Sequence, residues 1–338
     1  MTGTKFAILG GGAWGLALAK LLSENGHDVK VWEYNPEYVA LLRDTHANPF
    51  LLKGITLPDA VFFSHAFDEV LTPDTEHLIF AVPSQFLRQA VRSAAPYLCA
   101  LPGLKSIINV AKGIEENTLQ RMSEVLSEEL PDCQKALVIC LSGPSHAEEV
   151  ARKIPTAVVL AGSDDELLES LQPLFSNAYF RAYRAPDLIG VEVGGAVKNI
   201  IAIAAGIIDG LGFGDNTKGA LLTRGLVEIR RLGIALGAMP ETFLGLSGVG
   251  DLFTTAASQH SRNRFVGYEL GQGKKLNAIL ASMQAVAEGV ATTRSVHALA
   301  LKLGVEMPIT AQVHAVLFDD KQPLQAMTEL MTRSLKSE

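Results

Sequence analysis

The sequence predicts an α/β protein: residues 1–186 form a Rossmann-like, doubly wound parallel sheet, and residues 187–338 form a mostly α-helical domain. In the first part, apolar runs typical of buried strands alternate with amphipathic helical patterns. A glycine-rich turn separates the first apolar run from the first helical pattern. After Pro186, strand-like alternation almost disappears and long helical patterns follow. The 338 residues are enough for two such domains.

Each expected strand is a short apolar run, and amphipathic segments lie between most of these runs. The expected strands cover 6–9, 29–32, 78–82, 106–111, 137–141 and 157–160. The expected helices cover 14–24, 37–44, 84–97 and 118–130 in the first domain, and 219–237 and 291–304 in the second. Gly26 lies where the first helix should stop, at a C-cap position before the second strand.

The composition is that of a globular chain, with 48% hydrophobic and 19% charged residues. A net charge of −7 without a long basic run argues against nucleic-acid binding. The longest apolar stretch, 199–208, lies between Lys198 and Asp209 and is too short to span a bilayer. The N-terminus lacks the basic region and cleavage site of a secretion signal. We therefore expect a cytoplasmic protein without a membrane span.

The three cysteines have no metal-ligand spacing, and we expect reduced, small core residues and no metal site. These cysteines are Cys99, Cys133 and Cys140.

The glycine-rich turn has the pattern G-x-G-x-x-G, formed by Gly10, Gly12 and Gly15. Gly10 permits a tight turn, Gly12 lets the backbone approach a pyrophosphate, and Gly15 lets helix and strand pack closely. The free N–H groups of the helix N-terminus then face the anion. The alternative is an ordinary glycine-rich turn. The position between a strand and a helix favours a dinucleotide cofactor.

The end of the second expected strand bears on which dinucleotide fits. Glu33 follows Gly15 by 18 positions, where a carboxylate would accept hydrogen bonds from the ribose hydroxyls of NAD. Its neighbours Tyr34 and Asn35 offer no cation for the 2′-phosphate of NADP. Glu33 therefore favours NAD slightly. The alternative is that Glu33 faces solvent one residue beyond the ribose.

Two further turns follow expected strands. Lys112 ends one strand, where it would point into the ligand crevice of an open α/β sheet; the alternative is a solvated loop lysine. Gly143 and Pro144 predict a turn whose backbone could line a site, after which Ser145 can cap the next helix. His146 could act as a base, but a lone histidine after a turn is more often incidental.

The segment 193–207 is apolar nearly all round, yet it contains Lys198. Burial lowers the pKa of a lysine, which suits a general acid and base near neutral pH. The alternative is that Lys198 snorkels to the surface. Gly248 and Gly250 bracket a turn that brings Asp251 to the start of a short helix, where its carboxylate could orient Lys198.

The segment 261–264, with the sequence SRNR, offers Arg262 and Asn263 as a compact donor set for a phosphate monoester. The alternative is a solvated polar loop.

Taken in order, these motifs resemble the bacterial-type, NAD(P)-dependent glycerol-3-phosphate dehydrogenases over nearly the whole chain. The motifs that carry the resemblance are GGGAWGLALA, VPSQ, AKGIE, SGPSHAEEVA, the long run from GVEVGGAVKN to TRGLVEI, GLSGVGDLFTT, SRNR and AEG. The resemblance implies a Rossmann-like domain and a helical substrate domain. It also implies reversible reduction of dihydroxyacetone phosphate to sn-glycerol 3-phosphate, the precursor of glycerophospholipids.

The resemblance also assigns roles to residues, with Lys198 as the catalytic acid and base and Asp251 beside it. The substrate site would contain Lys112, Gly143, Ser145, Lys198, Asp251, Ser261, Arg262 and Asn263. The further cofactor contacts would be Ala13, Trp14, Tyr34, Lys112, Ala147, Arg262, Val286 and Glu288. Many relatives carry Arg or His where Tyr34 stands and a small residue where Glu33 stands, so the choice between NAD and NADP stays open. The apolar helical domain is compatible with a homodimer.

Two other readings stay open at this point. A 3-hydroxyacid or 6-phosphogluconate type dehydrogenase shares the two-domain plan and an inward lysine, but takes a carboxylate substrate. A redox sensor would bind NAD(H) without chemistry. The embedded Lys198 argues against a sensor, which has no need of a buried lysine beside the nicotinamide.

Overall fold

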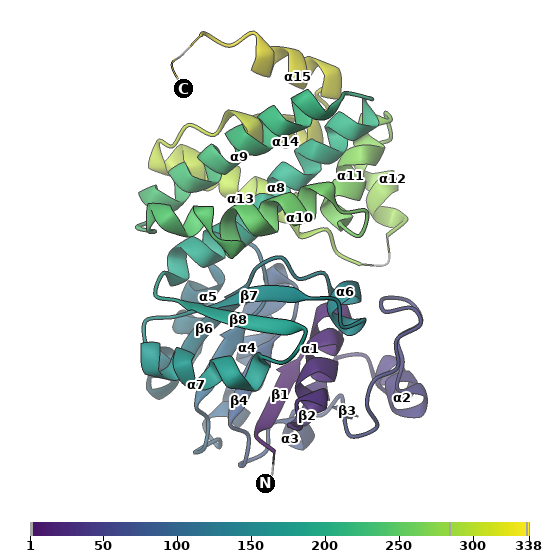
Figure 1. Ribbon diagram of the computed structural model, residues 1–338, viewed down its shortest axis with the longest axis vertical. Coiled ribbons are helices and arrows are strands. Elements are labelled where there is room, and N and C mark those ends of the chain that lie inside the picture. Colours follow the sequence, from purple (N-terminus) through teal and green to yellow (C-terminus); the bar gives the residue numbers. More distant parts are fainter. Residues whose placement is uncertain (1–2, 284, 336, 338) are drawn as a thin grey trace. The chain divides into compact units, whose positions relative to one another are not determined.

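The computed structural model describes residues 3–283, 285–335 and 337, apart from the side chain of Cys133. The chain forms two compact units, each described here by itself (Figure 1). The first unit contains residues 1–112 and 121–188, and the second contains residues 113–120 and 189–338. The short segment 113–120 therefore groups with the helical unit, although its neighbours in the sequence belong to the sheet.

The first unit is built on one eight-stranded sheet, in the order β3-β2-β1-β4-β5-β6-β7-β8 (Figure 1). The strands are β1 (Lys5–Leu9), β2 (Asp28–Trp32), β3 (Phe62–Ser64), β4 (His77–Phe80), β5 (Ser106–Asn109), β6 (Val138–Ser142), β7 (Thr156–Ala161) and β8 (Phe180–Ala185). The first six strands have the doubly wound order, which reverses direction between β1 and β4. Ligands of such sheets bind at the carboxyl ends of the strands beside this reversal.

The predicted parallel sheet is correct except at one pair, because β6 and β7 run antiparallel. The connection between them holds only the five-residue helix α6 (Ala147–Ala151), so the chain turns back along the sheet instead of crossing over it. The last pair, β7 and β8, is parallel again and is joined through a full helix, α7 (Asp165–Phe175).

Helices cover both faces of this sheet with separate apolar clusters. One cluster takes buried side chains from α1, α2, α6 and α7, and the other takes them from α3, α4 and α5. The remaining helices of the unit are α1 (Ala13–Glu24), α2 (Pro36–Thr45), α3 (Phe67–Val70), η1 (Ser84–Phe86), α4 (Leu87–Leu98), α5 (Met122–Glu129) and η2 (Asp132–Leu137). Because both faces are covered, the central strands β1 and β4 consist almost entirely of buried side chains.

The end of α1 confirms the predicted role of Gly26. Gly26 has a φ of 88°, and its N–H donates to the carbonyl of Ser23, while the N–H of His27 donates to the carbonyl of Leu22. These two bonds form a Schellman motif, which needs a left-handed residue and therefore favours glycine. The motif turns the chain directly into β2.

Two cysteines test the expectation of small core residues. Cys140 is buried in β6, but Cys99 is exposed, so the prediction is wrong for Cys99. Cys99 is the C-cap residue of α4 and lies beyond the apolar face of that helix. The side chain of Cys133 lies outside the described residues.

The second unit is helical and packs around one long central helix, α8 (Leu188–Gly210). The others are α9 (Asp215–Ala235), η3 (Pro240–Leu244), η4 (Leu246–Gly250), α10 (Asp251–Ala257), α11 (Arg262–Gly271), α12 (Leu276–Ala281), α13 (Glu288–Leu303), α14 (Pro308–Phe318) and α15 (Pro323–Met331). By length and composition α8 could cross a membrane, but its most apolar window is 100% buried. Its apolar side chains are therefore used in the core of this unit.

Candidate functional site

The glycine-rich turn lies directly after β1, beside the reversal of the strand order. Gly10 has a φ of 120°, and a Cβ there would lie 2.6 Å from the carbonyl oxygen of Ala81, so the tight turn requires glycine. A Cβ on Gly15 would overlap the carbonyl oxygen of Gly10, which confirms the close packing of helix on strand. At Gly12, by contrast, a Cβ would meet nothing within 4 Å. Protein packing therefore does not require a glycine at position 12, and a closely approaching ligand would.

The helix that follows the turn is suited to an anion. Gly12 is the N-cap residue of α1, and no side chain caps its first turn. Ala13 and Trp14 follow as the first helical residues, and both are partly exposed. The uncapped N–H groups and the positive end of the helix dipole can hold a phosphate. This half of the site fits the pyrophosphate of a dinucleotide.

Glu33 lies under the glycine turn. It is 6% exposed, so the alternative in which it faces solvent is wrong. Its Oε2 accepts a hydrogen bond of 2.9 Å from the N–H of Gly11, and its Oε1 accepts one of 3.3 Å from the N–H of Asn35. Burial raises the pKa of Glu33 above its usual range, while these backbone hydrogen bonds oppose the shift. The carboxylate thus stabilises the glycine turn through these hydrogen bonds, independently of any hydrogen bond to a ribose.

Two aromatic side chains are exposed after the strands that flank β1. Tyr34 follows β2 and is 76% exposed, and Phe86 lies in η1 after β4 and is 55% exposed. Large exposed rings beside a ligand crevice are available to stack on a base. Sequence reasoning missed Phe86, although an apolar residue soon after the strand end was a usable signal.

Lys112, Gly143 and Ser145 come together in the first unit. The Nζ of Lys112 donates to the carbonyl oxygen of Gly143 at 3.0 Å, and the hydroxyl of Ser145 donates to the same oxygen at 3.1 Å. Gly143 has a φ of 129°, and a Cβ there would lie 3.1 Å from the Cα of Val158. The lysine is therefore held by this turn and is not simply a solvated loop residue.

The predicted capping role of Ser145 is wrong. The N-cap residue of α6 is His146, so Ala147 is its first helical residue, and no side chain caps this helix. Because the helix begins one position later than expected, the hydroxyl of Ser145 turns back to the Gly143 carbonyl. That leaves the first N–H groups of α6 without a side-chain cap.

Lys198 is buried in the middle of α8 and is 5% exposed, so the snorkelling alternative is wrong. Its Nζ donates to the Oδ1 of Asp251 at 2.5 Å and to the hydroxyl of Thr255 at 2.6 Å. Asp251 is only 1% exposed and begins α10. The structure thus confirms the predicted contact between Lys198 and Asp251. A buried ammonium of this kind requires such partners.

The backbone before Asp251 explains how the carboxylate reaches α8. The π-helical turn η4 runs so close to α8 that a Cβ on Gly194 would overlap the carbonyl oxygen of Ser247. Sequence reasoning missed Thr255. It lies four residues after Asp251, on the same helical face, and this spacing could have identified it.

The segment 261–264 forms the start of α11 and not a solvated loop. Ser261 is its N-cap residue and accepts a hydrogen bond of 3.2 Å from the N–H of Arg264. Ser261 and Asn263 are buried, whereas Arg262 is exposed. Arg264 is held by Asp209, with an Nε–Oδ2 distance of 2.7 Å. The two arginines therefore differ, and Arg262 is the one available to a ligand.

Asn263 links α11 to the start of α13. Its Oδ1 accepts a hydrogen bond of 2.9 Å from the N–H of Gly289, which directs its amide nitrogen elsewhere. A Cβ on Gly289 would lie 2.8 Å from the carbonyl oxygen of Asn199, next to Lys198 in the sequence. The starts of α11 and α13 thus meet the middle of α8. Glu288, the first residue of α13, is half-buried there.

The other predicted residue near α13 is Val286, which precedes the helix and is 45% exposed. The predicted site residues thus fall into two sets, one in each unit. In the first unit they are Gly10, Gly12, Ala13, Trp14, Gly15, Glu33, Tyr34, Lys112, Gly143, Ser145 and Ala147. In the second unit they are Lys198, Asp251, Ser261, Arg262, Asn263, Val286 and Glu288. Among the described residues, no group of three or more His, Cys, Asp or Glu side chains could hold a metal ion.

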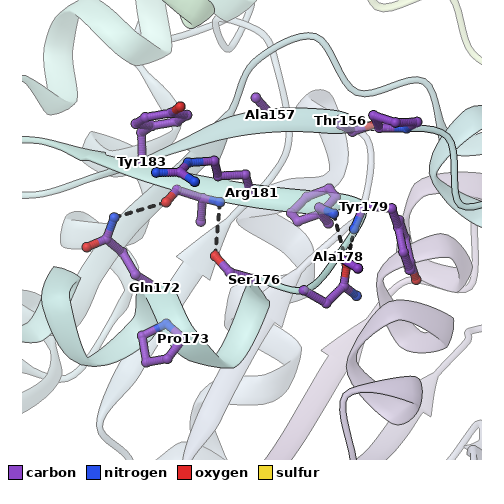
Figure 2. A pocket seen from close by; sticks show the side chains of 13 residues that line it. Thr156, Ala157, Gln172, Pro173, Ser176, Ala178, Tyr179, Arg181 and Tyr183 are labelled. Carbon is purple, nitrogen blue, oxygen red and sulfur yellow. Dashed lines mark hydrogen bonds between the residues drawn. The ribbon is translucent and has the colours of Figure 1, made fainter.

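A cavity of about 710 Å³ lies in the first unit, away from these residues, beside α7 and β8 (Figure 2). There the side chain of Gln172 donates to the carbonyl of Ala182 at 2.9 Å, and the hydroxyl of Ser176 accepts from the N–H of Ala182 at 3.1 Å. These two side chains form hydrogen bonds with the backbone C=O and N–H of Ala182 in β8, the last strand of the sheet. None of the predicted site residues lines this cavity.

Comparison with known proteins extends over both units. The model of the NAD-dependent glycerol-3-phosphate dehydrogenase N-terminus matches residues 5–168, and that of the C-terminus matches residues 187–328. Glycerol-3-phosphate dehydrogenase [NAD(P)+] of Citrifermentans bemidjiense is 48% identical over 99% of this chain and 98% of its own. The enzyme of the same name from Chlorobium luteolum is 49% identical over 98% of both chains.

A solved structure gives the same result. The crystal structure of glycerol-3-phosphate dehydrogenase from Coxiella burnetii matches with a TM-score of 0.92 and 36% identity, over 98% of this chain and 99% of that one. The similarity in sequence and the similarity in fold therefore both cover nearly the whole length of this chain.

Proposed function

The chain belongs to the NAD-dependent glycerol-3-phosphate dehydrogenase family, and from this premise we propose how its residues divide the work of that reaction. The chain is an oxidoreductase that interconverts sn-glycerol 3-phosphate and dihydroxyacetone phosphate with NAD or NADP. When bound, the nicotinamide supplies or accepts the hydride. The chain's own residues must then bind both ligands, orient them and move one proton.

Lys198 is the proton donor in the reducing direction. As hydride reaches the carbonyl carbon of the ketone, negative charge develops on the carbonyl oxygen, which an adjacent ammonium stabilises and protonates. In the reverse direction the neutral amine accepts the hydroxyl proton of glycerol 3-phosphate. Asp251 and Thr255 hold the Nζ of Lys198 in place at 2.5 Å and 2.6 Å. This buried trio is the observation that carries the proposal of an enzyme.

The start of α11 binds the phosphate of the substrate. Ser261, Arg262 and Asn263 are the N-cap residue and the first two residues of a ten-residue helix, whose N-terminus attracts anions. The exposed guanidinium of Arg262 can donate hydrogen bonds to two phosphate oxygens. The Oδ1 of Asn263 accepts from the N–H of Gly289, so its amide nitrogen would be the group that donates to the phosphate. Binding energy at this remote group positions the reacting carbonyl.

The glycine turn and the start of α1 bind the pyrophosphate of the cofactor. The rest of the cofactor would contact Tyr34, Lys112, Ala147, Arg262, Val286 and Glu288, the residues expected from the sequence resemblance. The free space at Gly12 and the uncapped start of α1 support this assignment. Lys112, Gly143 and Ser145 line the substrate side of the same unit. Residues 1–186 would form the dinucleotide-binding domain and residues 187–338 the helical substrate domain, with some residues of each domain contacting the other ligand.

The buried carboxylate of Glu33 favours NAD over NADP, because it would repel a 2′-phosphate. In the cell the chain would supply glycerol 3-phosphate for glycerophospholipids. It would work in the cytoplasm, as a homodimer and without a membrane span.

The test is the loss of absorbance of NADH, and in parallel of NADPH, with dihydroxyacetone phosphate as the substrate. Turnover with either cofactor is the expected result. NADH binding without turnover would favour a redox sensor. Turnover only with a 3-hydroxyacid or 6-phosphogluconate would favour the other two-domain dehydrogenases.

A further inference from the structure

The Gly11 residue of the glycine turn is held from two sides by side chains that no cofactor contact explains. Its N–H donates to Glu33 at 2.9 Å, and its carbonyl oxygen accepts a hydrogen bond of 3.0 Å from the hydroxyl of Tyr38. Tyr38 is the third residue of α2 and is partly buried. These two bonds fix two successive peptide groups, those before and after Gly11.

The second of these peptide groups also carries the N–H of Gly12. The Gly11–Gly12 peptide is trans, so its C=O and its N–H point in opposite directions. By holding the carbonyl of Gly11, Tyr38 turns the N–H of Gly12 away from α2. No described residue accepts a hydrogen bond from that N–H. The space beside Gly12 is open, because a Cβ there would meet nothing within 4 Å.

The hydroxyl of Tyr38 is itself oriented by Asn48, which is only 1% exposed. The amide nitrogen of Asn48 donates to the Tyr38 oxygen, so the hydroxyl proton is free to point at Gly11. The Oδ1 of Asn48 accepts hydrogen bonds from the N–H groups of Phe50 and Leu51 at 2.9 Å and 2.8 Å. Because the oxygen is held there, the amide nitrogen of Asn48 is the end that faces Tyr38.

The backbone of Tyr38 is equally fixed. Asn35 caps α2 and accepts a hydrogen bond of 3.3 Å from the Tyr38 N–H, while the N–H of Asn35 donates to Glu33. One continuous set of hydrogen bonds therefore runs from the loop after α2, through Asn48 and Tyr38, to Gly11 and back through Glu33. Each donor in this set has an acceptor.

We propose that Tyr38, oriented by Asn48, is a positioning residue that aims the N–H of Gly12 at the pyrophosphate of the dinucleotide. It touches neither the cofactor nor the substrate. This inference rests on the proposed role of the glycine turn. Since NADH and NADPH share the pyrophosphate, Tyr38 should affect both alike, unlike Glu33, which lies where the two cofactors differ.

The experiment uses the full chain and compares ADP-ribose, which carries the pyrophosphate, with adenosine, which does not. Binding constants are measured by calorimetry for the wild type and for Tyr38→Phe. We expect Tyr38→Phe to weaken the binding of ADP-ribose by about 3- to 10-fold, the effect of one lost hydrogen bond, and to leave the binding of adenosine unchanged. The binding of NADH and of NADPH should weaken by the same factor, with kcat at saturating cofactor unchanged.

Tyr179→Phe is the matched control, because it removes a tyrosine hydroxyl that bonds to Glu24 at 3.0 Å in the same unit but outside the turn. Asn48→Asp is the second variant. It keeps the acceptor for Phe50 and Leu51 but replaces the donor to Tyr38 with an acceptor, which would draw the hydroxyl proton away from Gly11. It should give the same selective loss of ADP-ribose binding.

Two results would overturn the inference. One is unchanged ADP-ribose binding in both Tyr38→Phe and Asn48→Asp, and the other is an equal loss of adenosine, which would indicate a merely structural role. Gly12→Val separates this failure from that of the proposed cofactor site. If Gly12→Val abolishes ADP-ribose binding while the Tyr38 and Asn48 variants do not, only the inference about Tyr38 fails. If Gly12→Val also binds normally, the glycine turn is not the pyrophosphate site.

Discussion

At the scale of the residue, the proposed chemistry depends on the ammonium of Lys198, which is buried in an apolar helix. Asp251 and Thr255 both accept hydrogen bonds from the Nζ of Lys198. These bonds hold the ammonium in one orientation within the apolar surroundings of α8. The trio therefore fixes the direction of proton transfer as well as the presence of the proton.

Replacing Lys198 and Thr255 separates these two contributions. Lys198→Ala should lower kcat by roughly 10²- to 10⁴-fold, the range for a positioned general acid, and leave NADH binding unchanged. Thr255→Val removes one hydrogen-bond partner of the Lys198 ammonium and should lower kcat by about 10-fold with little change in KM. Steady-state kinetics and an NADH fluorescence titration measure both effects.

Thr254→Val is the matched control for Thr255→Val, because Thr254 is the adjacent residue of α10 and is only half-buried. It should behave as the wild type does. A Lys198→Ala enzyme with normal turnover would refute the assignment of the proton donor. Equal losses in Thr254→Val and Thr255→Val would mean that α10 as a whole is disturbed.

Glu33 supports the glycine turn, and we propose that it also disfavours NADP. Glu33→Gln keeps an acceptor for the Gly11 N–H but removes the charge that would repel a 2′-phosphate. The ratio of kcat/KM with NADPH to that with NADH should rise by about 10-fold. Glu37→Gln, an exposed carboxylate in the first turn of α2, is the control and should leave the ratio unchanged. An unchanged ratio in Glu33→Gln would limit Glu33 to supporting the turn.

At the scale of the element, the second unit contains a buried carboxylate that is not among the proposed site residues. Glu228 of α9 is 2% exposed and accepts hydrogen bonds from the N–H groups of Ile309 and Thr310 at 2.6 Å and 3.1 Å. It thereby serves the start of α14, where Pro308 is the first residue. Burial raises the pKa of Glu228 to about 7, against the opposing effect of these hydrogen bonds.

This shift makes the attachment of α14 dependent on pH. The folded pKa lies above the unfolded value, so the stabilisation is complete below about pH 4.5 and is lost as the pH rises through about 7. The loss is about 3 kcal/mol. Urea unfolding of the wild type and of Glu228→Gln should show it. The wild type's advantage in the free energy of unfolding should shrink between pH 5 and pH 8, and a constant difference would contradict the assignment.

The elements that could be predicted from sequence are those with a strong local pattern. The strands beside the glycine turn, α1 with its Gly26 cap, and the buried run around Lys198 follow directly from periodicity and turn chemistry. The sequence analysis missed β3, with three residues, and also β8, whose side chains alternate between buried and exposed along Phe180–Ala185. The antiparallel β6–β7 pair depends on tertiary packing, which local patterns do not contain.

At the scale of the whole molecule, the sequence order and the packing order differ at one segment. Residues 113–120 lie between β5 and α5 in the chain but group with the helical unit. Ile114 is fully buried in the apolar cluster of that unit, and its carbonyl accepts a hydrogen bond of 2.9 Å from Ser295 of α13. Glu116 pairs with Arg294 of the same helix at 2.9 Å. Lys112 directly precedes this anchored segment.

Ile114→Ala should therefore destabilise the helical unit, although position 114 follows a strand of the sheet in the sequence. Truncation of a fully buried isoleucine costs about 2–5 kcal/mol. Ile154→Ala is the matched control, because that side chain is 42% exposed and should cost less than about 0.5 kcal/mol. Urea unfolding measures both, and hydrogen exchange should show the loss of protection in α13 and not in β1 or β4. Loss of protection confined to the sheet would instead place Ile114 energetically with the first unit.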